Sequence, residues 1–303
     1  MNGFEQALAG GIESGTVILY PALGELIGER SGVVNLGTEG CMLAGALAAY
    51  AVTAKTGSPA LGVLAGAGGG VLIGVGHAYL VVRRRADHLA SGLVMWFLAL
   101  GLTAVLGAAF VSQRATALPT VKIPILGSIP WLGRILFNHD PLVYLGYLLV
   151  PLVWWVLHRT RVGLVLRATG ERPVVVAVAG RRPQLVQIAA VSIGAALGGI
   201  GGAQLSVGYV DNWFDDMTNG YGFVAVAVVL FAGWRPLWVL FGSYLFGVAL
   251  ASASVLQAHG VSVNQYLLDA LPYMITIIAL VMLARRGSDR APEGITKALT
   301  NTS

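Results

Sequence analysis

Polar side chains gather in one short stretch of an otherwise apolar chain, residues 28–40, with the sequence GERSGVVNLGTEG. Asn35 stands where the N-cap of a following helix is expected, and Glu39 falls in its first turn, where the helix dipole stabilises a carboxylate. One interpretation is a structural acid, paired with Arg30. The other is a broken helix whose exposed amides and polar side chains line a solute pathway. The residues alone leave both interpretations open.

A second unusual element opens the apolar segment 219–236, NGYGFVAVAVVLFAGWRP. Its first glycines permit a helix break or a close approach of two backbones. We interpret Tyr221 and Phe223 as a wall of a solute pathway, with interfacial or lipid-facing aromatic side chains as the alternative. Trp96 is a weaker candidate of the same kind, for which packing in the core is the plainer explanation.

A third element, residues 159–183, reads RTRVGLVLRATGERPVVVAVAGRRP and is basic. Its arginines fit a loop on the cytoplasmic side of a membrane. Its centre, residues 174–179, is more apolar than a free loop requires. This favours a short helix that docks against a partner protein over a solvated basic face.

Sequence motifs of catalysis are not found. The chain has no GxSxG, HExxH or paired-cysteine motif and no phosphate-binding loop of the GxxxxGK[ST] type. Cys41 is the single cysteine and lies in an apolar run, so we expect a buried small side chain rather than a reactive thiol. We therefore predict no catalytic residue, metal or cofactor in this chain, and an intramembrane enzyme is disfavoured.

The composition places these elements in a membrane. Of 303 residues, 56% are hydrophobic and 11% are charged, and the mean hydropathy is +0.76. Globular domains carry about 25% charged residues. Because helices satisfy their own backbone polar groups in a bilayer, we expect an all-α polytopic membrane protein. The net charge of +5 is then a matter of membrane topology rather than of nucleic-acid binding.

Nine apolar segments are candidates for transmembrane helices, which need roughly 20 residues. They are residues 10–27, 36–52, 59–82, 89–111, 142–158, 186–207, 220–232, 237–258 and 270–283. The seventh and ninth are short, and we expect the polar stretch 28–40 to break the second.

Basic residues predict the orientation of these helices. With a cytoplasmic C-terminus, alternation puts all 19 basic residues on the cytoplasmic side except Lys55, Arg114, Lys122 and Arg134. Nine helices then require an external N-terminus. We expect a transmembrane domain at 1–286, with a cytoplasmic loop at 159–183 and a structured external loop at 112–141. A disordered polar tail is expected at 287–303.

Three blocks of the sequence resemble one family. GERSGVVNLGTEG is similar to a block in the membrane subunits of ABC importers of the branched-chain amino acid, ribose and nucleoside permease group. RATGERPVVVAVAGRRP, residues 167–183, looks like the cytoplasmic loop RA-x-GEN-x-x-AA-x-x-x-GI of that group. GYGFVAVAVVLFAGWRPL, residues 220–237, is similar to its GxGFxxIAxAxxGxxxP helix. The VNLGTEG form is closest to the shorter permease of nucleoside importers, often labelled simple-sugar permeases.

The resemblance implies a set of partners and a bacterial inner-membrane location. They are a homologous second permease, with a heterodimer favoured, an ATPase subunit with two nucleotide-binding domains that holds ATP and Mg, and an external substrate-binding lipoprotein. Membrane lipid surrounds the chain, and no nucleic acid is expected as a partner. The permease would transport nucleosides, with purine nucleosides favoured, and would have no catalytic residue.

The resemblance also implies roles for individual residues. The pathway residues that we expect are Asn35, Glu39, Trp96, Tyr221 and Phe223. The residues expected to couple the permease to its ATPase lie in the cytoplasmic loop and are Arg167, Ala168, Gly170, Glu171, Ala177, Gly180 and Arg181. The chain departs from the family pattern at 174–176 and 178, where valine replaces the usual alanine or asparagine.

Two alternatives remain. The first is a permease of the same type for a simple sugar such as ribose. The second is an ATP-independent secondary transporter driven by protons through Glu39, Glu25 or Asp269.

Overall fold

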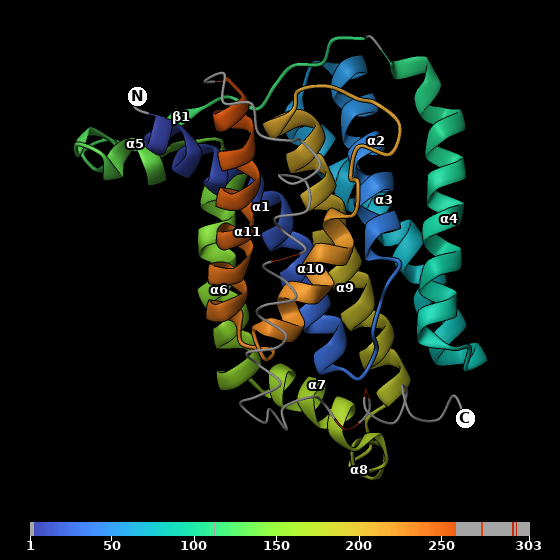
Figure 1. The fold of residues 1–303 in the computed structure, drawn as a ribbon. Helices are drawn as coiled ribbons and strands as arrows, with labels where there is room; N and C mark the ends of the chain where they lie inside the picture. Colours follow the sequence, from blue (N-terminus) through green and yellow to red (C-terminus); the bar gives the residue numbers. More distant parts are fainter. Residues whose placement is uncertain (1–2, 112, 259–273, 275–292, 294, 296–303) are drawn as a thin grey trace.

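The computed structural model describes residues 3–111, 113–258, 274, 293 and 295, which form a bundle of helices (Figure 1). The longer helices are α1 (Gly3–Arg30), α2 (Thr38–Thr56), α3 (Pro59–Ala78), α4 (His88–Gly107), α6 (Pro141–Arg159), α9 (Pro183–Ala203) and α11 (Pro236–Ala258). The shorter helices are α5 (Leu132–Leu136), α7 (Arg161–Glu171), α8 (Pro173–Val178) and α10 (Tyr221–Phe231). Single π or 3₁₀ turns are η1 (Tyr79–Arg83), η2 (Ala108–Phe110), η3 (Leu126–Ser128) and η4 (Gln204–Tyr209).

Among the described residues, five helices are long and apolar enough to cross a membrane. They are Pro59–Arg83, His88–Phe110, Pro141–Arg159, Pro183–Tyr209 and Pro236–Leu256. Each corresponds to a segment predicted from hydropathy, and α10 is a shorter apolar helix at the predicted seventh segment. The all-α, membrane-spanning character is thus confirmed. Only residue 274 of the ninth segment, 270–283, and residues 293 and 295 of the tail 287–303 are described, so the count of nine helices and the orientation stay predictions.

Helix α9 is the centre of the bundle and packs against α1, α2 and α3. Glycines make these contacts close. A β-carbon on Gly24 of α1 would lie 2.3 Å from the carbonyl oxygen of Gly194, and one on Gly45 of α2 would lie 2.4 Å from the Cα of Gly199. Small residues let helix backbones approach where a bilayer supplies no hydrophobic force between helices. The abundant glycine of the sequence therefore has a packing role.

The loop expected to be structured, 112–141, contains the two short strands of the described fold. Strand β1 (Val121–Lys122) pairs with β2 (Asn138–His139) in antiparallel fashion, and α5 lies between them. His139 joins this unit to α1, since its Nδ1 lies 3.1 Å from the carboxylate of Glu13. The described part of this loop, residues 113–141, thus contains short elements of regular secondary structure.

Candidate functional site

The polar stretch 28–40 connects α1 to α2 through a non-helical segment, residues 31–37. Here backbone amides leave the helical ladder although the side chains around them are buried. A carboxylate of α1 replaces part of that ladder: Glu25 accepts hydrogen bonds from the backbone amide of Asn35 at 2.7 Å and from the Thr38 hydroxyl at 2.9 Å. The predicted break is present, but it precedes α2, which is itself continuous.

The predicted role of Asn35 as N-cap is wrong. Helix α2 begins at Thr38, its N-cap is Gly37, and no side chain caps it. The backbone oxygen of Asn35 instead accepts a bond from the Thr38 amide at 3.1 Å. Its side chain is buried, and Oδ1 has no hydrogen-bond partner in the described part of the chain.

Glu39 joins α2 to α10. Its two carboxylate oxygens accept hydrogen bonds from the backbone amides of Gly220 at 2.9 Å and of Gly222 at 2.6 Å. Gly220 is the N-cap of α10, has φ of +87° and offers no side chain for capping. An acceptor from another helix thus satisfies the free amides and suits the positive end of the helix dipole. The pairing of Glu39 with Arg30 is not found: the Arg30 guanidinium donates to the backbone oxygen of Trp234 at 3.1 Å.

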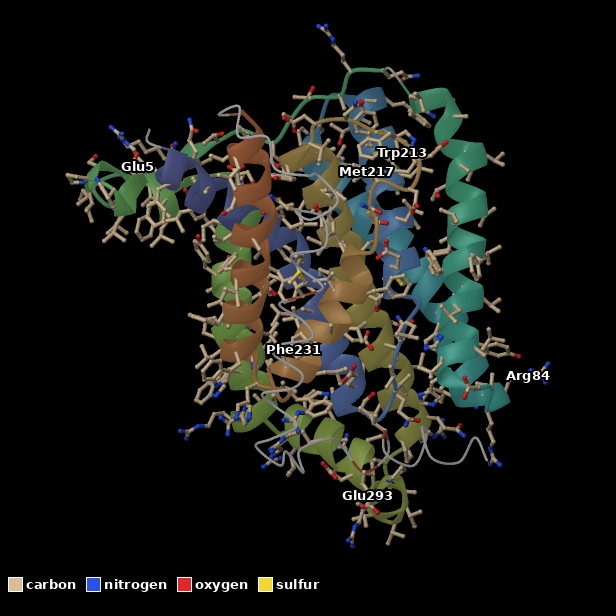
Figure 2. The ribbon with its side chains drawn as sticks, viewed as in Figure 1. Glu5, Arg84, Trp213, Met217, Phe231 and Glu293 are labelled. Atoms are coloured by element: carbon tan, nitrogen blue, oxygen red, sulfur yellow. The ribbon has the colours of Figure 1, made fainter. Side chains whose placement is uncertain are left out.

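The loop before α10 returns into the bundle, which lets α10 begin inside it. Trp213 and Met217 of this loop are buried against α2 (Figure 2). Figure 1 shows that α2 and α10 both begin partway along α9 and run in opposite directions from that point. Two helix N-termini therefore meet inside the bundle, with the Glu39 carboxylate between them.

Aromatic residues surround this meeting point, which we call the junction and define by Asn35, Glu39, Trp96, Gly222 and Phe223. The Trp96 and Phe223 rings meet edge to face with centroids 5.1 Å apart. A β-carbon on Gly40 would lie 3.0 Å from the Cα of Trp96, so α4 and the start of α2 are in close contact. Trp96 Nε1 is buried and has no partner among the described residues. Tyr221, in the first turn of α10, is partly buried beside the junction.

The other end of α10 is held by the same polar stretch. Trp234, just after α10, donates its indole N–H to the carboxylate of Glu29, and Arg30 donates to its backbone oxygen. The polar stretch thus anchors both ends of α10, through Glu39 at the start and through Glu29 and Arg30 at the end. Sequence reasoning missed Trp234; its positive φ of 55° is visible only in the structure.

The cytoplasmic loop predicted at 159–183 consists of α7 and α8. Of the expected coupling residues, Glu171, Ala177, Gly180 and Arg181 are exposed, while Arg167 and Ala168 are partly buried and Gly170 is buried. Gly170 lies against the polar stretch, because a β-carbon there would be 2.4 Å from the backbone oxygen of Arg30. A larger residue at this position would collide with backbone, so Gly170 has a packing role in the fold.

Helix α8 presents apolar side chains outward. Val174, Val175 and Val178 are 74%, 58% and 84% exposed, and Val176 faces inward at 4%. The structure separates α8 from the pathway candidates: α7 and α8 lie at one end of the bundle (Figure 1), while the junction lies within it. The contact of α7 with the polar stretch connects α8 to the pathway candidates at the junction.

Removing the charge of Glu39 should loosen the junction. In Glu39→Gln one oxygen that accepts a backbone amide is replaced by an NH₂ group that faces a donor. We expect a loss of roughly 2–3 kcal/mol of stability, measured as a lower thermal midpoint of the protein in detergent. Asp215→Asn is the control, because Asp215 is an exposed acid of the loop before α10. Equal midpoints for the two variants would contradict the anchoring role.

Comparison with known proteins supplies the family. The chain is 36% identical to a putative glucose ABC transporter permease of Haloferax volcanii, over 89% of this chain and 88% of the relative. It is 31% identical to the nucleoside ABC transporter permease NupC of Lactococcus lactis and 32% identical to the guanosine ABC transporter permease NupQ of Bacillus subtilis. Both of these alignments cover 92% of each chain. No solved structure matches the chain.

The family assignment agrees with the resemblance of the three sequence blocks and with the prediction of a transport subunit rather than an enzyme. A family model for the permease component of branched-chain amino acid transport systems matches residues 7–280. Since that match covers most of the chain, this protein belongs to that family of multi-pass membrane permeases.

Proposed function

We propose that the chain is the permease subunit of an ATP-driven importer of nucleosides, with purine nucleosides preferred. Two of the relatives carry nucleoside and guanosine in their names, which supports this class of solute. The observation that carries the proposal is the exposed apolar face of α8, at the end of the bundle where α7 adds further arginines. Such a face is typical of an interaction surface, and in an ABC importer the partner at this end of the permease is the ATPase.

The proposed orientation follows the basic residues. The end with α7 and α8 is cytoplasmic, the loop 112–141 is external, and the complete chain crosses a bacterial inner membrane nine times, with its N-terminus outside. A second, homologous permease completes the pathway, and an external lipoprotein delivers the solute. ATP and Mg are bound by the ATPase and not by this chain.

The contacts of the polar stretch suggest how movement of α8 reaches the pathway. The ATPase displaces α8 and with it α7, whose Gly170 lies against the backbone of Arg30. Arg30 and Glu29 hold Trp234 at the end of α10. A shift of α7 therefore moves α10 as a unit, and packed elements that move between two discrete arrangements are a common form of such switching.

The junction has groups suited to a nucleoside. Asn35 Oδ1 and Trp96 Nε1 offer an acceptor and a donor that no described residue uses. Trp96 is stacked on Phe97 with centroids 4.7 Å apart and meets Phe223 edge to face at 5.1 Å. Aromatic side chains of this kind are the groups on which a purine base stacks. We propose that these contacts form transiently as the solute passes, while the external binding protein supplies the affinity.

The proton-driven alternative is less well supported. Glu25 and Glu39 each accept hydrogen bonds at both carboxylate oxygens, so both acids already have structural roles. Asp269 lies outside the described residues. One relative, the putative glucose permease, supports the sugar alternative.

One uptake experiment separates these three functions. Proteoliposomes with this chain, its partner permease and the ATPase are supplied with binding protein and radiolabelled guanosine, with unlabelled glucose or ribose as competitor. We expect uptake that requires ATP inside the vesicles, continues with a proton uncoupler and resists a large excess of either sugar. Uptake by this chain alone that stops with the uncoupler would refute the ABC assignment, and competition by sugar would refute the solute.

A charge on the outer face of α8 should uncouple the transporter. Val178→Glu places a carboxylate where the proposed ATPase groove is apolar, and the loss of fit should lower uptake more than tenfold. Val121→Glu is the control, since it makes the same change at an exposed valine at the other end of the bundle. The measurement is ATP-driven uptake together with co-purification of the ATPase. Equal uptake by both variants would show that α8 is not the coupling element.

A further inference from the structure

A large cavity lies at the basic end of the bundle, outside the contacts described so far. It has a volume of about 830 Å³, is open to the outside of the bundle, and is lined by η1, the start of α4, α8 and the start of α9. Four arginines line it: Arg83, Arg85, Arg181 and Arg182. Val33, Val81 and Val82 are also in its wall.

The charges of this cavity are not balanced within the described structure. No carboxylate is among its lining residues, and none of its four arginines forms an ion pair with a described residue. Arg83 donates to the amide oxygen of Gln184 at 3.3 Å, which leaves its charge uncompensated. Guanidinium groups bind phosphate oxygens with matching geometry, so the cavity is suited to a phosphate-bearing anion.

An apolar groove adjoins the cavity. It has a volume of about 350 Å³, runs between α7 and α9, and shares Arg181 and Leu185 with the cavity. Three of its apolar side chains, Val162, Leu185 and Ile193, are 68%, 48% and 54% exposed. A hydrocarbon chain that enters from the outside of the bundle would cover them.

We propose that the cavity and the groove together bind an anionic phospholipid, with the headgroup phosphate among the arginines and one acyl chain in the groove. A free phosphate compound would satisfy the arginines but leave the groove uncovered, and a zwitterionic lipid would bring less negative charge. The site goes beyond the proposed transport function. It bears on that function because Val174 and the exposed Ala177 of α8 line the cavity. A bound lipid therefore contacts one edge of the apolar face of α8 and leaves Val175 and Val178, which do not line the cavity, to the ATPase.

Two pairs of variants with equal loss of charge test the site. Arg83→Gln with Arg182→Gln removes two charges from the cavity. Arg84→Gln with Arg159→Gln removes two charges outside it; Arg84 projects outward beside the Tyr79 ring (Figure 2). Native mass spectrometry of the full chain in neutral detergent measures binding of dioleoyl phosphatidylglycerol. We expect binding about tenfold weaker or more in the cavity pair and close to wild type in the control pair.

A third variant tests the acyl chain. Ala189→Phe fills the groove from an exposed position of α9, and Ala104→Phe makes the same change on the exposed face of α4. We expect several-fold weaker phosphatidylglycerol binding for Ala189→Phe only. An unaffected Ala189→Phe, with glycerol 3-phosphate displacing the lipid, would show a site for a soluble anion instead.

Other results also overturn the proposal. Equal binding by the two arginine pairs would place the lipid elsewhere, and equal affinity for dioleoyl phosphatidylcholine would remove the role of charge. The same measurement on the complex with the ATPase should retain the bound lipid. Complete displacement by the ATPase would mean that the cavity belongs to the protein interface. These binding measurements need no uptake assay, so their failure is distinguishable from failure of the proposed transport function.

Discussion

The structure depends on satisfying backbone amides where helices are interrupted inside an apolar bundle. Inside such a bundle a backbone amide that lacks a hydrogen-bond partner costs several kcal/mol. Two glutamates supply the acceptors. Glu25 binds the amide of Asn35 within the break, and Glu39 binds the first amides of α10. The first turns of α2 and α10 can therefore lie next to each other within the bundle.

This constraint gives the polar stretch 28–40 a single explanation. Its carboxylates and Arg30 hold α10 at both ends, and its backbone at Arg30 contacts α7 through Gly170. The stretch is thus a structural connection between α8, which has the exposed apolar face, and the junction. In the proposed importer the same contacts carry movement from the ATPase to the solute, while the proposed lipid contacts α8 at Val174, at the edge of its apolar face.

Hydropathy was sufficient to predict the long helices and the short α10, because a bilayer imposes length and apolarity on each segment by itself. Polarity in an apolar setting likewise drew attention to residues 28–40 with Asn35 and Glu39. Phe223 was a candidate because of the glycine-rich helix start beside it, and Trp96 was only a weak candidate; that these two rings meet is visible only in the structure. Partners distant in the chain were beyond prediction. The amides that Glu39 binds lie 181 and 183 residues away in the sequence. The close contact of Gly170 with the Arg30 backbone likewise joins distant parts of the chain, and no sequence pattern indicates it. The N-cap prediction for Asn35 failed because a capping residue type does not reveal where the helix begins.

The most direct test of the account is whether the junction touches the solute. Asn35→Ala removes a buried amide whose Oδ1 has no described partner at the junction, and Thr53→Ala removes a buried hydroxyl without a described partner near the far end of α2. Guanosine uptake by the assembled transporter is measured for both at equal amounts of folded protein. The account predicts that uptake falls about tenfold for Asn35→Ala only. Equal uptake by the two variants would contradict it and leave the junction a purely structural element.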